Sequence, residues 1–585
     1  ALHARRFAQE GVTLGQLLKQ ASYTTRQAQC HGCENQCSVT TYCFQGGNRY
    51  YSGNRCEKVF SNRGRRHESG HNAYTEKLRL LFERDIPVAS PCTVIGIPRC
   101  LNMYEEFPFW HTLLSRCGIQ VILSAPSTFN RYEASARMVM SDNICFPAKL
   151  VHSHIQDLID RHVDRIFMPF VVFEKPDGGQ NSYNCPIVTG VQTTGIPIDA
   201  PTITFKDKQL LYKQCRDYLR PFGVDNSTLK MAFGEALAAM AEYEKRMAEY
   251  DKQVLTESAK QGRMAVLLAG RPYHADPLIQ HKLSDMIAAL GVDVITDDIV
   301  RGDGSMVSDA HFVAQWAYTN RILKAAEWVA GQSANVQFME MTSFGCGPDA
   351  FLTEETRNLL KRRGKTLTLL KIDDVSHIGS LKLRVRSTIE SLRRATQDAN
   401  STSVLPFATT PVYRKADRRR KIIAPFFTPF FSPLMPPLMK LAGYDVDILP
   451  PSDATSCDCG LRYANNEVCY PATLIVGDIV KAFKEGRYDP EQTAVAITQT
   501  GGQCRASNYI SLIKRALTEA GFGQTPVVSV SFSSGLRNEQ PGFRINWFRL
   551  IPVVLNALLF SDSIAKLYYA AAVREKVSGE AFRLK

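Results

Sequence analysis

The sequence predicts an α/β protein of repeated Rossmann-like units with parallel sheets, preceded by a small cysteine-rich head and ended by helices. Short apolar runs alternate with amphipathic stretches along most of the chain. A Cys-aromatic-Pro-Ala motif begins at Cys145 and occurs again at Cys469. The first copy begins 27 residues after the turn glycine Gly118, and the second begins 26 residues after Gly443. A motif repeated at constant spacing indicates repeated structural units. Strands that alternate with helices favour parallel sheets.

Length and composition describe a large globular chain. Its 585 residues suggest about three to five domains. A hydrophobic content of 44% and a charged content of 22% are ordinary for globular proteins. The net charge of +13 would suit nucleic acid, acidic lipid or a phosphate-bearing ligand, and it selects none of them.

The sixteen cysteines are more informative about the class of protein than the net charge is. Without a recognisable signal peptide, and with a chain too long to need disulfide staples, a cytoplasmic protein is expected. In a reducing compartment, clustered cysteines are more often metal ligands or redox groups. Residues 422–443 are apolar, but their five prolines argue against a membrane-spanning helix, so no membrane partner is expected.

Residues 1–70 are predicted to form a metal-binding or iron–sulfur head. Three thiols lie close together and a fourth follows across a predicted hairpin around Gly46 and Gly47, an arrangement that a tetrahedral metal site or a cubane cluster requires. Spacing does not separate zinc from iron–sulfur, and Cys43 is a spare candidate. The proposed ligands are Cys30, Cys33, Cys37 and Cys56.

A first α/β unit is predicted over residues 71–226. Strands are expected at 93–98, 119–123 and within 165–172, with helices at 107–116 and from Cys145 to about residue 161. A charged helix at 227–262 would link this unit to the next.

The same plan restarts twice, in units at 263–405 and 406–585. The second unit has strands at 264–270, 292–296 and 336–340. The third has strands at 421–424, 445–449 and 494–498, then two amphipathic helices at 546–560 and 564–574. Neither the Gly-x-Gly-x-x-Gly turn nor the Gly-x4-Gly-Lys-Ser/Thr loop occurs, so the chain offers no nucleotide site of its own.

The cysteines outside the head are expected to converge in a cleft between the units. Cys185, Cys346 and Cys504 follow predicted strands, and open α/β sheets bind ligands beyond the carboxyl ends of their strands. Cys145 and Cys469 precede Pro in the first turn of a helix, where the helix dipole favours a thiolate. Thiolates without histidine partners favour an iron–sulfur cluster over catalytic zinc. Scattered buried cysteines are the simpler alternative.

His274 lies in a Gly-Arg-Pro-Tyr-His segment at the predicted end of a strand. We expect it to be exposed to the same cleft, as a catalytic proton donor or a ligand-binding group. A structural histidine is the alternative.

Four segments, at 94–99, 143–149, 344–349 and 467–472, resemble the C-terminal region of the large 2-hydroxyacyl-CoA dehydratase activase-related proteins. The resemblance covers nearly the whole chain, the cysteine-rich head included. In that family this region follows actin-like ATPase activase domains. The cysteine-bearing units are similar to dehydratase subunits and to double-cubane cluster proteins, which hold a 4Fe-4S or an 8Fe-9S cluster.

Carried over by position, the resemblance implies six cluster ligands. The middle unit departs from the pattern because it has no Cys-aromatic-Pro copy, and Cys457 competes with Cys459 for the sixth place. The implied ligands are Cys145, Cys185, Cys346, Cys459, Cys469 and Cys504.

The function implied is that of an iron–sulfur reductase component. It would accept low-potential electrons from an ATP-hydrolysing activase, on a separate chain or in the same polypeptide, and pass them to a small substrate or an acyl-CoA. A homodimer is left open. The alternatives are a zinc-containing nucleic-acid-binding protein, which the poor interleaving of aromatic and basic residues disfavours, and a cluster carrier without catalysis.

Overall fold

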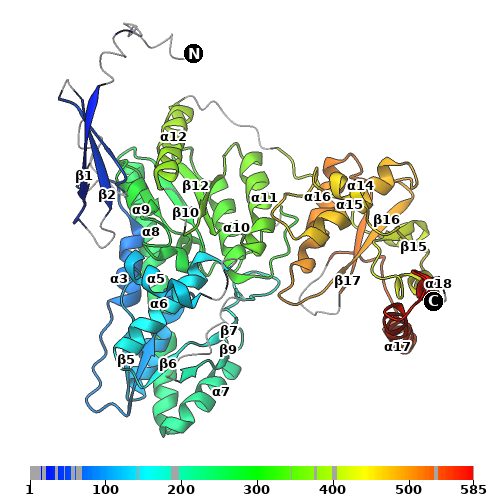
Figure 1. Ribbon diagram of the computed structural model, residues 1–585, viewed down its shortest axis with the longest axis horizontal. Helices are drawn as coiled ribbons and strands as arrows, with labels where there is room; N and C mark the ends of the chain where they lie inside the picture. The colour runs from blue at the N-terminus through cyan, green and yellow to red at the C-terminus, as the bar shows by residue number, and fades with distance from the viewer. Residues whose placement is uncertain are drawn as a thin grey trace.

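A computed structural model gives the fold of the chain (Figure 1). It describes residues 15, 22–32, 37–44, 47–54, 59–60, 69–139, 141, 144–185, 197–307, 309–343, 345–374, 378–397, 405–531 and 538–583. The antiparallel head lies at one end and the red C-terminal helix at the other. The green second unit lies between the cyan first unit and the orange third unit.

The head is a three-stranded antiparallel sheet of β1 (Tyr23–Gln29), β2 (Ser38–Phe44) and β3 (Arg49–Ser52). The predicted hairpin around Gly47 is therefore confirmed, and β1 adds a strand that was not expected. The Cys30 N–H donates to the Cys37 carbonyl at 2.8 Å, which closes the turn between β1 and β2. Cys33 and Cys56 lie outside the described residues, so the head site stays a prediction.

The first unit has a parallel sheet in the order β5-β4-β6-β8. The run predicted at 165–172 divides at Pro169 into β6 and β7, because proline lacks the N–H that a strand must donate; β7 pairs with β9 instead. The strands are β4 (Thr93–Ile97), β5 (Ile119–Leu123), β6 (Arg165–Phe167), β7 (Phe170–Phe173), β8 (Ile198–Asp199) and β9 (Thr202–Thr204). The helices are α3 (Ala73–Phe82), α4 (Met103–Arg116), α5 (Phe129–Ser135), α6 (Phe146–Asp160) and α7 (Lys208–Leu219).

The second unit repeats this order as β11-β10-β12-β13, again parallel. Its strands are β10 (Ala265–Ala269), β11 (Asp293–Ile295), β12 (Val336–Ser343) and β13 (Thr368–Ile372). Its helices are η4 (Pro272–Ala275), α9 (Leu283–Ala288), η5 (Asp297–Val300), α10 (Ala317–Ala330), α11 (Gly347–Arg362) and α12 (Ile378–Gln397).

The third unit has the order β15-β14-β16-β17. Its strands are β14 (Lys421–Ala424), β15 (Val446–Ile448), β16 (Thr493–Gln499) and β17 (Val527–Ser531). Its helices are α13 (Met435–Leu441), α14 (Ala454–Gly460), α15 (Tyr470–Lys484), η8 (Arg505–Asn508) and α16 (Tyr509–Glu519). The apolar stretch 422–443 is divided among β14, a 3₁₀ turn and α13, as its prolines require.

Three sheets with one strand order confirm the predicted class, in which parallel units repeat along the chain. In each, the first strand lies between the second and the third, so the carboxyl edge beside it is where such sheets bind ligands. The helix expected as a linker, α8 (Asn226–Lys260), buries apolar residues along its length, among them Phe233, Met240 and Met247. It packs against α4 of the first unit and η5 of the second, and so stiffens the connection between them.

The two predicted C-terminal helices are one, α17 (Trp547–Ala572). Within the described part of the chain it is the helix whose length and composition would allow it to cross a membrane, and 11% of its most apolar window is buried. Asp562 and Lys566 form an ion pair of 3.1 Å in its second half.

Candidate functional site

Four of the predicted ligand cysteines occupy the same structural position, the residue that begins a helix. Cys145 is the N-cap of α6 and Cys469 that of α15, each followed by proline in the first turn. Cys346 caps α11, and Cys504 caps the short helix η8 that runs into α16. The predicted helix-start and strand-end positions are therefore confirmed. At each, helix dipoles favour negative charge on sulfur.

The helix of the second unit that corresponds to α6 and α15 is α10, and its N-cap is Trp316 instead of cysteine. The Cys185 loop of the first unit lies at this helix start. Tyr183 makes a parallel bridge to Trp316, and the Ala317 N–H donates to the Tyr183 carbonyl at 3.0 Å. The first unit thus supplies a cysteine beside the helix of the second unit that lacks one.

The second unit also contributes a buried arginine, which sequence reasoning missed. Arg271 follows the end of β10 by two residues and is 3% exposed. Arg271 interacts electrostatically with the thiols of Cys145, Cys185 and Cys346, so three cysteines from two units lie near it. Tyr273 is equally buried, and the same three thiols contribute to its raised pKa. The sequence feature that could have indicated Arg271 is the Gly-Arg-Pro-Tyr segment directly after a predicted strand.

Arg271 is held in place by Asp349, in the first turn of α11. The guanidinium Nη2 donates to Asp349 Oδ1 at 2.6 Å, and Thr342 Oγ1 donates to Asp349 Oδ2 at 2.8 Å. Arg271 Nε has no hydrogen-bond partner among the described residues. A buried donor without a partner is uncommon and indicates a place for a further acceptor.

Glu340 on β12 lies behind this ion pair and is fully buried. Within the described structure, neither carboxylate oxygen has a hydrogen-bond partner. Burial, and then the charge of Asp349, hold its pKa well above the usual value, while Arg271 opposes them. Burial therefore favours the protonated form of Glu340.

The buried thiols are neutral without a bound cation. Burial raises the pKa of Cys145 to about 11, with Cys185 adding to the effect and Arg271 opposing it. Burial likewise raises the pKa of Cys346 well above its usual value, and Arg271 again opposes. A metal or cluster that binds here must displace these protons.

Cys469 and Cys504 form a second group around Tyr509. The Tyr509 hydroxyl lies 3.0 Å from Cys469 Sγ, and both thiols act on it. Burial, followed by the bond to Cys469, raises the pKa of Tyr509. Arg505 follows Cys504, so each group combines cysteines with a tyrosine and an arginine.

The two groups meet where the second and third units touch. A Cβ added to Gly347, next to Cys346, would overlap the Arg505 guanidinium. The Tyr183 hydroxyl donates to the Gly501 carbonyl at 3.2 Å, and Gln315 Nε2 donates to the Cys504 carbonyl at 3.3 Å. Loops from all three units thus converge, as the sequence predicted.

The predicted sixth ligand, Cys459, belongs to a hydrophobic core. Cys459 is 9% exposed and packs in the core of the third unit, where burial raises its pKa and Lys484, Arg462 and Lys481 oppose. Cys457, the other candidate, bonds to the hydroxyl of Tyr470, directly after Cys469. Of the two, Cys457 is the one in contact with the start of α15.

The expectation that His274 is exposed is wrong, because it is fully buried. Its Nδ1 accepts the Arg271 N–H at 3.1 Å, which leaves Nε2 protonated and 3.2 Å from Ser343 Oγ. Burial lowers the pKa of His274 to about 3, so it is neutral. A Cβ at Gly270 would lie 2.8 Å from Nδ1. The tight loop places His274 as a support for Arg271.

The cysteines at the convergence offer thiolates, which are the ligands that iron–sulfur clusters take. No group of three or more His, Cys, Asp or Glu side chains in the described ranges is close enough to hold a single ion. The unpartnered Arg271 Nε provides a donor for a sulfide or another acceptor.

Three parallel sheets whose edges bring cysteines together define an α/β protein in which cysteines of separate units lie near one another. Residues 94–300 match a protein-family model described as the CoA enzyme activase uncharacterised domain (DUF2229). This confirms the relationship to the 2-hydroxyacyl-CoA dehydratase activase-related family. The matched segment contains Cys145, Cys185 and Arg271. No curated protein matches the chain.

Proposed function

We propose that the chain is an iron–sulfur reductase component that works with an ATP-hydrolysing activase. It receives low-potential electrons at a cluster held by the convergent cysteines and passes them to a small substrate or an acyl-CoA. The observation that carries the proposal is the convergence of five cysteines from three units on buried arginine and tyrosine side chains. The family match supports the link to activases and CoA enzymes.

The chain's own residues would bind and compensate the charge of such a cluster. Cys145, Cys185 and Cys346 would hold one half, and Cys469 and Cys504 would hold the other. Arg271 balances negative charge at the first half, and the four N-caps add the positive ends of their helices. A 4Fe-4S or 8Fe-9S cluster would supply one-electron chemistry at low potential.

Anaerobic purification with iron and acid-labile sulfide analysis tests this directly. We expect brown protein, and a loss of iron in the variants Cys145→Ser, Cys346→Ser and Cys469→Ser. Cys92→Ser is the matched control, because Cys92 is exposed and lies outside the site. Colourless, iron-free protein with an intact fold would sink the proposal.

The head is tested separately by Cys30→Ser, which should remove zinc or iron from the head and leave the inter-unit site loaded. Stoichiometric zinc together with salt-sensitive nucleic-acid binding would favour the other class of protein. Turnover with an ATPase and a strong reductant separates a reductase from a cluster carrier.

A further inference from the structure

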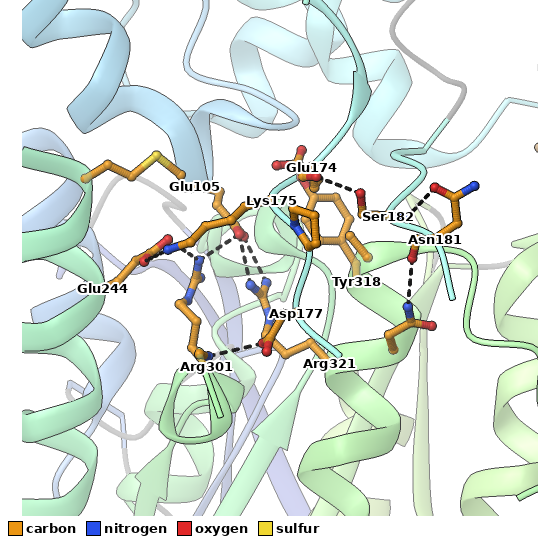
Figure 2. Close-up of a pocket in the computed structure, with 15 residues that line it drawn as sticks. Glu105, Glu174, Lys175, Asp177, Asn181, Ser182, Glu244, Arg301, Tyr318 and Arg321 are labelled. Carbon is orange, nitrogen blue, oxygen red and sulfur yellow. Dashed lines mark hydrogen bonds and ion pairs between the residues drawn. The ribbon is translucent and has the colours of Figure 1, made fainter. Parts of the chain in front are cut away.

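A pocket opens between α8, α10 and the segment 174–182 (Figure 2). Its cavity volume of about 60 Å³ holds a few water molecules and is too small for a substrate. At its rim, Lys175 Nζ pairs with Glu244 Oε2 at 2.8 Å.

The charged groups deeper in the pocket are paired. Glu105 accepts from Arg301 Nη1 at 2.7 Å and from Arg321 at 2.9 Å through each oxygen (Figure 2). Asp177 accepts from Lys324 Nζ at 2.9 Å. Paired charges leave water as the natural content of the pocket.

Glu174 lines the pocket and is connected to Cys185 by hydrogen bonds. This carboxyl is 3% exposed and accepts from the Tyr318 hydroxyl at 2.7 Å and from Asn184 Nδ2 at 2.9 Å. The side-chain oxygen Oδ1 of Asn184 accepts the Cys185 N–H at 2.6 Å. One amide side chain therefore separates Glu174 from the backbone of a proposed cluster ligand.

A second buried carboxyl, Glu106 of α4, faces Glu174. Trp110 Nε1 donates to Glu106 Oε2 at 2.9 Å. Burial, and then the charge of Glu174, hold the pKa of Glu106 well above its usual value, which favours its protonated form. Two buried carboxyls side by side do not both ionise readily.

Glu174, the other member of the pair, also has a raised pKa. Burial, followed by the Glu105 charge, raises the pKa of Glu174 to about 7, while bonds from Glu106 and Tyr318 and the charge of Arg321 oppose. Arg301 and Glu244 across the pocket, and Lys175 beside it in sequence, complete the charged groups around it. Glu174 therefore exchanges protons with the pocket near neutral pH.

We propose that Glu174, paired with Glu106, takes up a proton from the water-filled pocket when an electron enters the cysteine cleft. This proton uptake rests on the proposed function, and it would balance the charge that an electron adds at the cysteines. The electron would come from a low-potential one-electron donor, such as a reduced iron–sulfur protein, and would reduce the iron–sulfur cluster that the cysteines would hold. The proton comes from water in the pocket and forms the O–H bond of the Glu174 carboxylic acid. The added negative charge and the added proton cancel, and reoxidation returns the proton to the pocket.

The physical reason is the low dielectric of the surroundings. A negative charge added near Cys185 would interact strongly with the carboxylate of Glu174, because both lie in a buried region of low dielectric constant. Protonation of Glu174 removes that repulsion, and its hydrogen bond to Asn184 carries the effect to the Cys185 loop.

The first measurement uses the metal-free chain. Infrared spectra from pH 5 to 9 should contain a buried carboxylic acid band that disappears with a midpoint near 7 and is absent in Glu174→Gln. Tyr318→Phe keeps the carboxyl but removes a donor to its ionised form, so the midpoint should move upward. This second variant keeps the test open if Glu174→Gln does not fold.

The second measurement uses the anaerobically purified, iron-loaded chain. The midpoint potential of the wild type should fall as pH rises from 6 to 8, and it should be independent of pH in Glu174→Gln. Lys175→Gln, which removes an exposed cation from the pocket rim, is the matched control and should keep the wild-type slope.

The outcomes are distinct. No carboxyl titration between pH 6 and 8, or a potential slope that persists in Glu174→Gln, overturns the coupling and leaves the iron–sulfur proposal standing. A chain without iron fails the earlier iron analysis, and that result overturns both proposals.

Discussion

The Arg271–Asp349 ion pair gives the sharpest test of the site. Arg271→Met removes the cation, while Asp349 stays in a position where its side chain is 3% exposed and Thr342 is its remaining bonded partner. Breaking a buried pair by removing one partner costs about 3–5 kcal/mol, because an uncompensated charge is left behind. We expect the free energy of unfolding to fall by about that amount.

Urea denaturation at pH 7, followed by circular dichroism, measures the change. The double variant Arg271→Met/Asp349→Asn removes both charges and should lose less stability than Arg271→Met alone. Arg357→Met is the matched control, since Arg357 is 47% exposed and pairs with Glu354 on the same helix. It should cost less than about 1 kcal/mol.

The reasoning is refuted if Arg271→Met costs no more than Arg357→Met. It is refuted equally if the double variant is no more stable than Arg271→Met, because the cost would then come from lost packing instead of an unpaired charge.

Three further predictions follow from burial and close packing. The low pKa of His274 in the folded chain means that unfolding takes up a proton below pH 6.5, so stability should fall from pH 6.5 toward pH 3; His274→Gln should reduce this slope by up to about 1.4 kcal/mol per pH unit, and an unchanged slope in denaturation at several pH values would contradict it. The raised pKa of Glu340 has the opposite sign, with stability lost as pH rises above about 4.5; Glu340→Gln should therefore gain stability relative to the wild type as pH rises above about 4.5, and a difference in stability that does not change with pH would contradict the raised pKa. A Cβ at Gly477 of α15 would overlap the Ser456 carbonyl of α14, so Gly477→Ala should cost about 1–3 kcal/mol; Gly234→Ala on the open face of α8 should instead gain about 0.5–1 kcal/mol, and melting temperatures of the pair that move together would refute the packing argument.

Much of the fold could be predicted because its signals are local. The apolar runs at 119–123 and 421–424 became strands with the same bounds, β5 and β14. Proline two residues after Cys145 and Cys469 predicted two helix starts, since its ring suits the first turn. The same rule argued correctly against a membrane helix at 422–443.

The predictions that differ from the structure concern residues whose burial or pairing depends on segments distant in the sequence. His274 was expected in a cleft, but it lies beneath the Arg271 loop against Ser343 of another strand. A strand was expected within 165–172, but the run forms two strands, and the second, β7, pairs with β9, which lies about thirty residues further along the chain. Two C-terminal helices were expected, but the polar residues near 561–563 do not break α17, because serine and aspartate can remain in a helix when they face solvent or a neighbour.

By itself, the sequence determined the repeated α/β plan, the helix-start cysteines and the relationship to activase-associated proteins, because periodicity, proline positions and motifs act over a few residues. The tertiary structure alone decided that Cys185 fills the place beside Trp316, that Arg271 and Tyr273 lie among the three thiols of the first group, and that Glu106 and Glu174 share a buried site. These are meetings of side chains from different units. Burial and charge at such meetings depend on which surfaces the packed units bring together, which local sequence patterns do not encode.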